Sequence, residues 1–323
     1  MRATRRSFIL GAGAALAANG LHAETQDVLQ IRGPAFGAGW QVSVPDGADA
    51  KAIASAVSDI VASVDESASP FRAESEISAF NRIRTTDWIP LSPATLQVIE
   101  EAKRVAALTG GAFDPTLGGI VGRYGFGPIA TSRAGSFDDL SLGEQGVRKA
   151  HPAQTLDLCG IAKGHALDRI ASALAALGHP DFFVELGGEV TALGHHPEGR
   201  PWRAGIERPL AGATAMQHIV SIGREALATS GDAVNSYAYG NRRYCHIIDP
   251  HSGRPAETAL TSVSVFAPRA ITADALATAL FAMGPEQGAA FAESARIPAL
   301  FITRDAGSLR SLTTHDFATR IVG

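Results

Sequence analysis

Asp274 and Thr278 are two oxygen-bearing side chains whose spacing would let them act together. The segment around them, residues 272–280, is rich in alanine and leucine, which predicts a helix with Thr272 as its N-cap and a Gly-Pro pair at its end. Residues four apart lie on one helical face, so the carboxylate and the hydroxyl would stand side by side. Mg²⁺ prefers such hard oxygen ligands, with phosphate and water completing its shell. The alternative is that Asp274 only complements the helix dipole.

A second candidate segment is Cys159–His165, between a predicted short strand at Leu156–Leu158 and a predicted helix at Ala162–Leu177. Glycines at this point let the backbone approach a ligand, and a helix N-terminus favours phosphate. Lys163 would pair with that phosphate as a point charge. Because the spacing of a P-loop is missing, an ordinary glycine-containing turn is the alternative.

Two further polar segments could carry chemistry. Thr229–Asp232 places two hydroxyls, a glycine and a carboxylate in one turn, which suits a polar ligand or the outer shell of a metal, or else a turn that bonds its own backbone. His246 falls within a predicted strand, Tyr244–Ile248, where Asp249 could orient it; a purely structural histidine is the alternative. The other nine histidines show no metal-ligand spacing, which argues against zinc. A G-x-S-x-G elbow is missing, which argues against a serine hydrolase.

The chain begins with a pattern typical of export. Arg5 and Arg6 precede a short apolar run, Phe8–Ala18, and a small-residue cleavage site ends at Ala23. This predicts a twin-arginine signal peptide over residues 1–23 and a mature domain over residues 24–323. Losing three arginines from 28 basic residues leaves 25 against 32 acidic ones, a net charge of −7. An acidic protein is a poor candidate for non-specific nucleic-acid binding.

The mature sequence mixes helices and strands without a regular βαβ period, which favours an α+β fold. The other expected helices are residues 50–67, 93–108 and 286–295. The expected strands are residues 29–44 (a hairpin, or a strand with a glycine turn), 182–186, 202–207 and 218–222 (joined by a hairpin around Gly212), 262–267, 299–304 and a closing strand near 317–322, besides the two already given. Residues 226–232 are expected to be a strand end and a turn. The glycine-rich residues 112–135 have no assigned structure and are typical of a functional loop.

Six segments of the chain closely resemble motifs of the ApbE family, the FAD:protein FMN transferases, and occur in the family's order. They are Thr109–Thr116, Tyr124–Pro128, Leu158–Asp168, Ala228–Asp232, His246–Pro250 and Ala273–Leu280. The resemblance covers about residues 36–281. The sequence departs from the family pattern at Cys159 (usually glycine), at His165 (usually a tyrosine-type residue), at Phe36-Gly37-Ala38 (usually Met-Gly-Thr) and at Glu185–Glu189 (usually Asn-x-Gly-Gly-Asp).

The resemblance implies an α+β architecture with a T-fold-like core, FAD as substrate and Mg²⁺ as cofactor. FMN would pass to a threonine hydroxyl of a partner protein, AMP would leave, and His246 would be the base on that hydroxyl. By position, the Mg²⁺ ligands would be Ala162, Asp274, Ala277 and Thr278. The residues around FAD would be Phe36, Ala112, Phe113, Asp114, Tyr124, Phe126, Lys163, His165, Thr229, Ser230, Gly231, Asp232, Ile248 and Asp249.

The same resemblance leaves two alternatives open: hydrolysis of FAD to FMN and AMP, and a flavin carrier without chemistry. The twin-arginine start implies a periplasmic protein and resembles the branch linked to nitrous oxide reductase maturation, whose acceptor is a membrane-bound flavoprotein. Cys159 and Cys245 both fall in the candidate site segments, so a disulfide between them is conceivable. Two free thiols are the more common outcome.

Overall fold

The computed structural model describes residues 28–131, 135–209, 215–233, 235–240, 242–256, 258–305 and 308–323. The predicted signal peptide lies outside these described residues, as does the centre of the connection around Gly212. Among the described residues, no helix is both long and apolar enough to cross a membrane.

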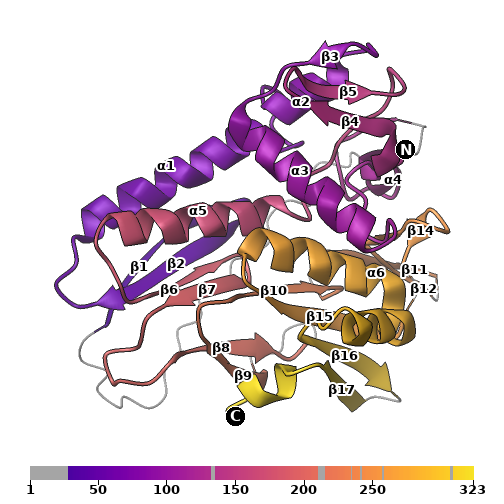
Figure 1. Cartoon of the computed structure of the whole chain (residues 1–323). Helices are drawn as coiled ribbons and strands as arrows, with labels where there is room; N and C mark the ends of the chain where they lie inside the picture. The colour runs from indigo at the N-terminus through magenta and orange to yellow at the C-terminus, as the bar shows by residue number, and fades with distance from the viewer. Residues whose placement is uncertain are drawn as a thin grey trace, which may run out of the picture.

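Six α-helices and seventeen strands make up the described part of the chain (Figure 1). The helices are α1 (Ala50–Ala68), α2 (Glu76–Arg82), α3 (Pro93–Leu108), α4 (Gly118–Arg123), α5 (Ala162–Ala176) and α6 (Ala270–Ser294). The strands are β1 (Val28–Ala35), β2 (Ala38–Pro45), β3 (Trp88–Ile89), β4 (Leu140–Gly143), β5 (Gly146–Lys149), β6 (Phe182–Leu186), β7 (Glu189–Leu193), β8 (Trp202–Glu207), β9 (Met216–Ile222), β10 (Ala226–Gly231), β11 (Ser236–Tyr239), β12 (Arg242–Cys245), β13 (Ile248–Asp249), β14 (Arg254–Pro255), β15 (Leu260–Ala267), β16 (Ala299–Asp305) and β17 (Ser308–Thr314). Short 3₁₀ turns lie at Phe137–Asp139 and Phe317–Arg320.

One eight-stranded antiparallel sheet organises the molecule, in the order β1-β2-β6-β7-β10-β15-β16-β17. Helices α1, α5 and α6 cover one face of it, and the β8–β9 hairpin covers the other (Figure 1). The central strand β15 is buried along its whole length because both faces are covered. Its Val263 and Val265 belong to the core under the helices, whereas Phe266 belongs to a second core with Trp202 and Phe317. The sheet therefore fixes the ends of β7 and β10 beneath α5 and α6.

Helix α6 begins earlier than the sequence suggests. The predicted N-cap, Thr272, is wrong: Arg269 holds that position, and the Asp168 carboxylate of α5 accepts hydrogen bonds from Ala270 N (2.7 Å) and Ile271 N (3.2 Å). Thr272 instead donates to the Glu101 carboxylate. A side chain 102 residues away thus satisfies the first N–H groups of the helix, as a cap must.

The predicted break at Gly284 is confirmed: Gly284 is non-helical (φ 79°, ψ 178°), Pro285 follows it, and the residues after this kink form a second helical stretch within α6. Two other sequence predictions are corrected. Residues 156–158 form no strand, because the Asn81 side-chain amide binds both N–H and C=O of Leu156 in place of a partner strand. The expected closing strand near residues 317–322 is mainly a 3₁₀ turn, and the last strand is β17.

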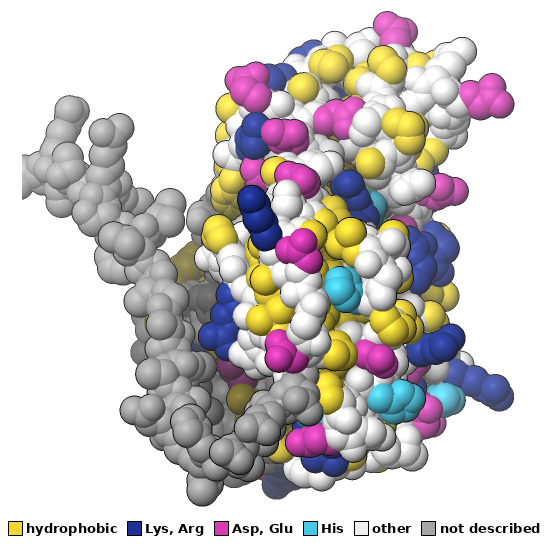
Figure 2. Space-filling view, turned by 90° about the vertical axis from the view of Figure 1, so that its left-hand side faces the viewer, with side chains coloured by type: hydrophobic (Ala, Val, Ile, Leu, Met, Phe, Trp, Pro, Cys, Tyr) yellow, Lys and Arg dark blue, Asp and Glu magenta, His cyan; other side chains and the backbone are white. Residues whose placement is uncertain are grey.

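The predicted turn at Thr229–Asp232 is also wrong, because Thr229, Ser230 and Gly231 continue strand β10 and pair with β15. The remaining predicted helices and strands are found close to their predicted bounds. Figure 2 shows a face on which acidic and basic side chains alternate with apolar ones, without a region of one sign.

Candidate active site

The first turn of α5 meets α6 and β7 in a cluster of charges, in which two carboxylates are buried and the lysine is partly exposed. The Lys163 ammonium forms an ion pair with Glu189, the first residue of β7. The Asp274 carboxylate lies on α6, and its Oδ2 accepts a hydrogen bond from Gly164 N at 2.9 Å. A side chain at Gly164 would lie 2.3 Å from the Ala270 carbonyl oxygen, so this glycine permits the close contact of α5 with α6. It serves helix packing rather than the approach of a ligand.

This cluster contains two carboxylates, those of Asp274 and Glu189, and one ammonium group, that of Lys163. Burial raises the pKa of Asp274, although Lys163 and the Gly164 N–H oppose the shift. Burial likewise raises the pKa of Glu189 to about 8, with the Lys163 charge opposing it and the Asp274 charge adding to it. Two buried carboxylates therefore share one ammonium, and the cluster favours an additional cation.

Hydroxyl groups extend the cluster along α6 and β10. The Thr278 and Ser230 hydroxyl oxygens are hydrogen-bonded at 3.2 Å. A Cβ at Gly160 would lie 3.3 Å from Thr278 Oγ1 and 3.2 Å from the Phe113 ring, so the loop before α5 passes close to both. The structure thus brings together residues from four of the six motif segments.

A line of aromatic rings adjoins this cluster. Tyr124 stacks on Tyr244, Tyr244 on Tyr237, and Tyr237 on Phe126, with ring centroids 6.3, 5.3 and 5.3 Å apart. Phe126 then contacts His246 edge-on at 6.4 Å. The rings come from the glycine-rich loop and from the β11–β12 hairpin, and they form a surface suited to a planar ligand.

His246 lies between β12 and β13 rather than within a strand, which corrects the predicted Tyr244–Ile248 strand. Its Nδ1 is 3.3 Å from the Asn235 carbonyl oxygen, which can only accept, so Nδ1 carries the proton and Nε2 is free to take one. Burial lowers its pKa, the Asn235 bond opposes this, and the Lys163 charge adds to it. His246 is therefore neutral at pH 7 and lies near Lys163. Asp249 does not orient it, because that carboxylate accepts from His251 N and Ser252 N.

The turn between β1 and β2 lies beside the same cluster. Phe36 takes a left-handed conformation (φ 49°) in this two-residue turn. Gly187, at the turn between β6 and β7, donates its N–H to the Gly39 carbonyl at 3.0 Å. A Cβ at Gly187 would lie 3.5 Å from Lys163 Cδ, so both turns border the lysine.

Some predicted site residues are engaged elsewhere in the structure. The Asp114 carboxylate binds Thr116 and the Phe137 N–H within its own loop. Asp232 is held by Arg304 and Arg243, and the Thr229 hydroxyl pairs with Ser264 at 2.8 Å. The pKa of the buried His165 is lowered by burial first and then by the charges of Arg169 and Arg269.

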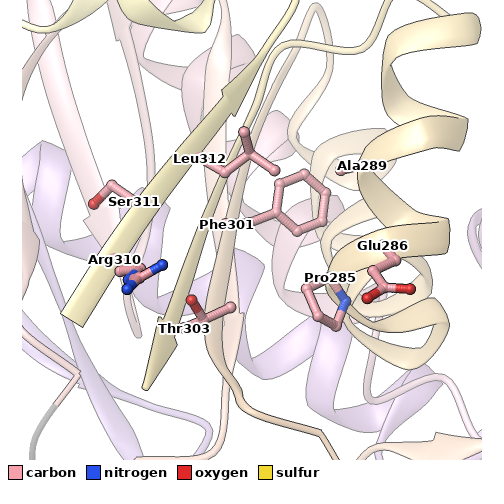
Figure 3. A pocket seen from close by; sticks show the side chains of 8 residues that line it. All are labelled: Pro285, Glu286, Ala289, Phe301, Thr303, Arg310, Ser311 and Leu312. Atoms are coloured by element: carbon pink, nitrogen blue, oxygen red, sulfur yellow. The ribbon is translucent and has the colours of Figure 1, made fainter. Parts of the chain in front are cut away.

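Two cavities lie close to the surface. One, of about 340 Å³, has Ala112 and Asp249 among its lining residues. Ile248, which immediately precedes Asp249 in the sequence, is buried. The other, of about 410 Å³, lies between the second half of α6 and strands β16 and β17, with Phe301 and Leu312 on its walls (Figure 3). None of the predicted site residues lines this second cavity, which separates it from the candidate active site.

Comparison with known proteins assigns the chain to a family. The model of the ApbE family matches residues 36–301. The FAD:protein FMN transferase of Vibrio cholerae is 34% identical over 305 residues, which cover 90% of this chain and 91% of that protein. The protein of the same name from Escherichia coli K12 is 29% identical over 316 residues, covering 92% and 90% of the two chains. The chain belongs to the ApbE family.

Solved ApbE structures share the fold described above. The flavin transferase ApbE from Vibrio cholerae matches with a TM-score of 0.81 and 33% identity, covering 91% of this chain and 99% of that one. The apo form of the Pseudomonas stutzeri flavinyl transferase ApbE matches with a TM-score of 0.82 and 31% identity, covering 91% and 96%. The predicted α+β fold with antiparallel sheets is confirmed.

Sequence reasoning missed three residues of this ApbE site. Glu189 had been noted only as a departure from the family pattern, and Tyr237 and Tyr244 were not singled out. An isolated acidic residue after two glycines gives little signal, whereas two tyrosines close together, one of them in the predicted strand Tyr244–Ile248, could have been noticed. Cys159 and Cys245 are both free, so the considered disulfide is not present.

The residues of the ApbE site fit Mg²⁺. Asp274, Thr278 and Ser230 offer hard oxygen atoms, and because burial disfavours the charged form of Asp274, a cation bound there would stabilise that charged form. Among the described residues, no three His, Cys, Asp or Glu side chains meet as a metal site.

Proposed function

We propose that this protein is an Mg²⁺-dependent transferase that moves FMN from FAD to a threonine hydroxyl of a partner protein. Transfer of FMN from FAD to a protein is the activity named for its relatives, and membership of the ApbE family extends it to this chain. The threonine and the metal are the finer parts of the proposal. They are supported by the neutral His246 and by the oxygen cluster around Asp274.

In the proposed reaction, the threonine oxygen attacks the phosphorus on the FMN side of the FAD pyrophosphate. A new P–O bond to threonine forms, the bond to the bridging oxygen breaks, and AMP leaves with that oxygen. His246 Nε2 takes the hydroxyl proton as general base. Lys163 binds the pyrophosphate as a point charge, while Tyr124 and Phe126 border the ring system. Phe36, Ala112 and Phe113 complete the proposed walls.

The proposed holders of the metal are the Asp274 carboxylate, the Thr278 hydroxyl and the carbonyl groups of Ala162 and Ala277. Bound there, Mg²⁺ would neutralise charge on the pyrophosphate. The protein's own task is to fix these oxygens, and the Gly164 N–H and the Ser230 hydroxyl do so through Asp274 and Thr278.

One observation carries the proposal: the charge of Lys163 acts on Glu189, on Asp274 and on His246. The proposed metal ligand and the proposed base therefore both lie within electrostatic reach of the proposed phosphate-binding residue. Mass spectrometry of a candidate acceptor protein incubated with FAD and MgCl₂ tests the function. A stable FMN adduct supports transfer, free FMN with AMP supports hydrolysis, and intact FAD supports a carrier.

We further propose that the protein acts in the periplasm on a membrane-bound flavoprotein. The basis is the twin-arginine pattern at Arg5 and Arg6, which marks proteins exported in the folded state. Cell fractionation tests it: replacing both arginines by lysine should leave the precursor in the cytoplasm. A variant that still reaches the periplasm would refute this route.

A further inference from the structure

Lys163 lies between two buried carboxylates, those of Glu189 and Asp274. It forms an ion pair with Glu189, which has no role in the proposed reaction. The Glu189 side chain is only 2% exposed. The Oε2 atom of Glu189 is buried without a hydrogen-bond partner. Keeping such a carboxylate inside a protein is costly, and a buried ion pair is weak evidence of stabilisation. Glu189 therefore calls for a functional explanation.

The second carboxylate, Asp274, would compete for the same ammonium. Its charge acts on Lys163 together with that of Glu189, so it lies within electrostatic reach. Removing one partner of a buried ion pair leaves an uncompensated charge, which is strongly unfavourable. Without Glu189, the flexible lysine side chain would turn to Asp274 and occupy the oxygen atoms that the cation needs.

We propose that Glu189 is a positioning residue that holds Lys163 away from Asp274 and so keeps the Asp274 carboxylate open to a divalent cation. The inference rests on the proposed function for the role of Asp274. The turn before β7 supports it, because a Cβ at Gly187 would lie 3.5 Å from Lys163 Cδ and 3.8 Å from Glu189 Oε2. The turn thus borders the lysine stem and the glutamate together and confines the pair.

Three variants titrated with MgCl₂ in the absence of FAD test this arrangement. Glu189→Gln should weaken Mg²⁺ binding about tenfold or more, the scale seen when a residue that supports a metal ligand is removed. Adding Lys163→Met should restore the affinity to within about threefold of wild type, because the competing ammonium is gone. Calorimetry gives the Kd, and the rise of Tm with MgCl₂ gives an independent readout.

Glu185→Gln is the matched control. Glu185 lies on the other side of the same turn and feels the Lys163 charge, but its carboxylate accepts from Gly188 N and is not the ion-pair partner of Lys163, so Mg²⁺ affinity should change by less than about threefold. If Glu189→Gln does not fold, Glu189→Asp replaces it in both the single and the double variant. Glu189→Asp should also weaken Mg²⁺ binding.

Two results would overturn the inference and leave the transferase proposal standing. In the first, folded Glu189→Gln binds Mg²⁺ as tightly as the wild type. In the second, the double variant with Lys163→Met binds Mg²⁺ as weakly as Glu189→Gln alone. A wild-type protein that binds no Mg²⁺ would overturn the inference and the metal part of the proposed function together. Flavin transfer, assayed separately on an acceptor, would then decide whether the rest of the function remains.

Discussion

Asp274 is the residue on which the proposed metal chemistry depends most directly. It is buried on α6, and the Gly164 N–H fixes one of its oxygens. We expect Asp274→Ala to lose nearly all FMN transfer and most of the dependence on Mg²⁺, with a loss of affinity for Mg²⁺ of at least 10–100-fold. FAD affinity should fall less, because the aromatic rings remain. Calorimetry with each ligand and a transfer assay measure these effects, and wild-type turnover at low Mg²⁺ would contradict them.

His246 should show its role as a base in the pH dependence of transfer. Burial lowers its pKa from the ordinary value of 6.5, so the imidazole stays neutral until the pH falls below that value. The rate of the wild type should therefore fall on the acid side with a midpoint below 6.5. His246→Gln should lower the rate by about 10²–10⁴ and remove this acid limb.

The control for this change is His251→Gln, which alters an exposed histidine five residues further along the chain. It should leave both the rate and the acid limb in place. A rate for His246→Gln within a few-fold of wild type between pH 6 and 8 would show that another group is the base.

The residue types of the candidate site could be predicted from the sequence, but their environments could not. Asp274, Thr278, Lys163 and His246 are candidates because hard oxygen ligands, a phosphate-binding cation and a base are recognisable from side-chain chemistry and motif order. Glu189 is not, because its meaning comes from an ion pair formed across 26 residues of sequence. Spacing within one segment cannot show which charges a fold will bury together.

At the scale of elements, α6 carries both Asp274 and Thr278, and its start is fixed by Asp168 of α5. We expect Asp168→Ala to lower the free energy of unfolding by about 1–2 kcal/mol, the usual loss for a helix cap. Because the cap also orients α6 against α5, Mg²⁺ affinity should fall as well. Urea unfolding and MgCl₂ titration measure the two effects.

Asp49→Ala provides a matched comparison, since Asp49 caps α1 by accepting from Lys51 N and Ala52 N, both at 3.0 Å. It should destabilise the protein by a similar amount and leave Mg²⁺ affinity unchanged, because α1 carries none of the proposed ligands. Equal effects of the two variants on Mg²⁺ binding would contradict the proposed role of the Asp168 cap.

Most elements followed from local sequence signals, and three of the errors share one physical cause. Helix α3 was placed correctly because its cap, Ser92, and its first residue, Pro93, are adjacent. Helix α6, by contrast, is capped from another helix, and Leu156 finds its backbone partner in the Asn81 side chain. Phe317 is apolar because it fills the second core, not because it lies in a strand. Partners distant in sequence decided each of these cases.

At the scale of the whole molecule, the stability should depend on pH through His165. This histidine is buried between α5 and its neighbours, and its pKa is lowered to about 4 by burial first and then by Arg169 and Arg269. The unfolded chain, with a histidine pKa near 6.5, therefore binds more protons than the folded one between about pH 4 and 6.5. The contribution of His165 to stability is complete above pH 6.5 and is lost as the pH falls through about 4.

Replacing His165 by a residue that does not titrate in this range should make the stability less dependent on pH. His165→Gln, or His165→Tyr as in the family pattern, should reduce the slope of the unfolding free energy against pH. The reduction should be at most about 1.4 kcal/mol per pH unit, which corresponds to the binding of one proton. The slope should not vanish, because burial also lowers the pKa values of His196 and His246. Urea unfolding at several pH values from 4.5 to 7.5 measures it. If both variants keep the wild-type slope, His165 binds its proton equally in the folded and unfolded chain, and its surroundings do not exclude the charged form.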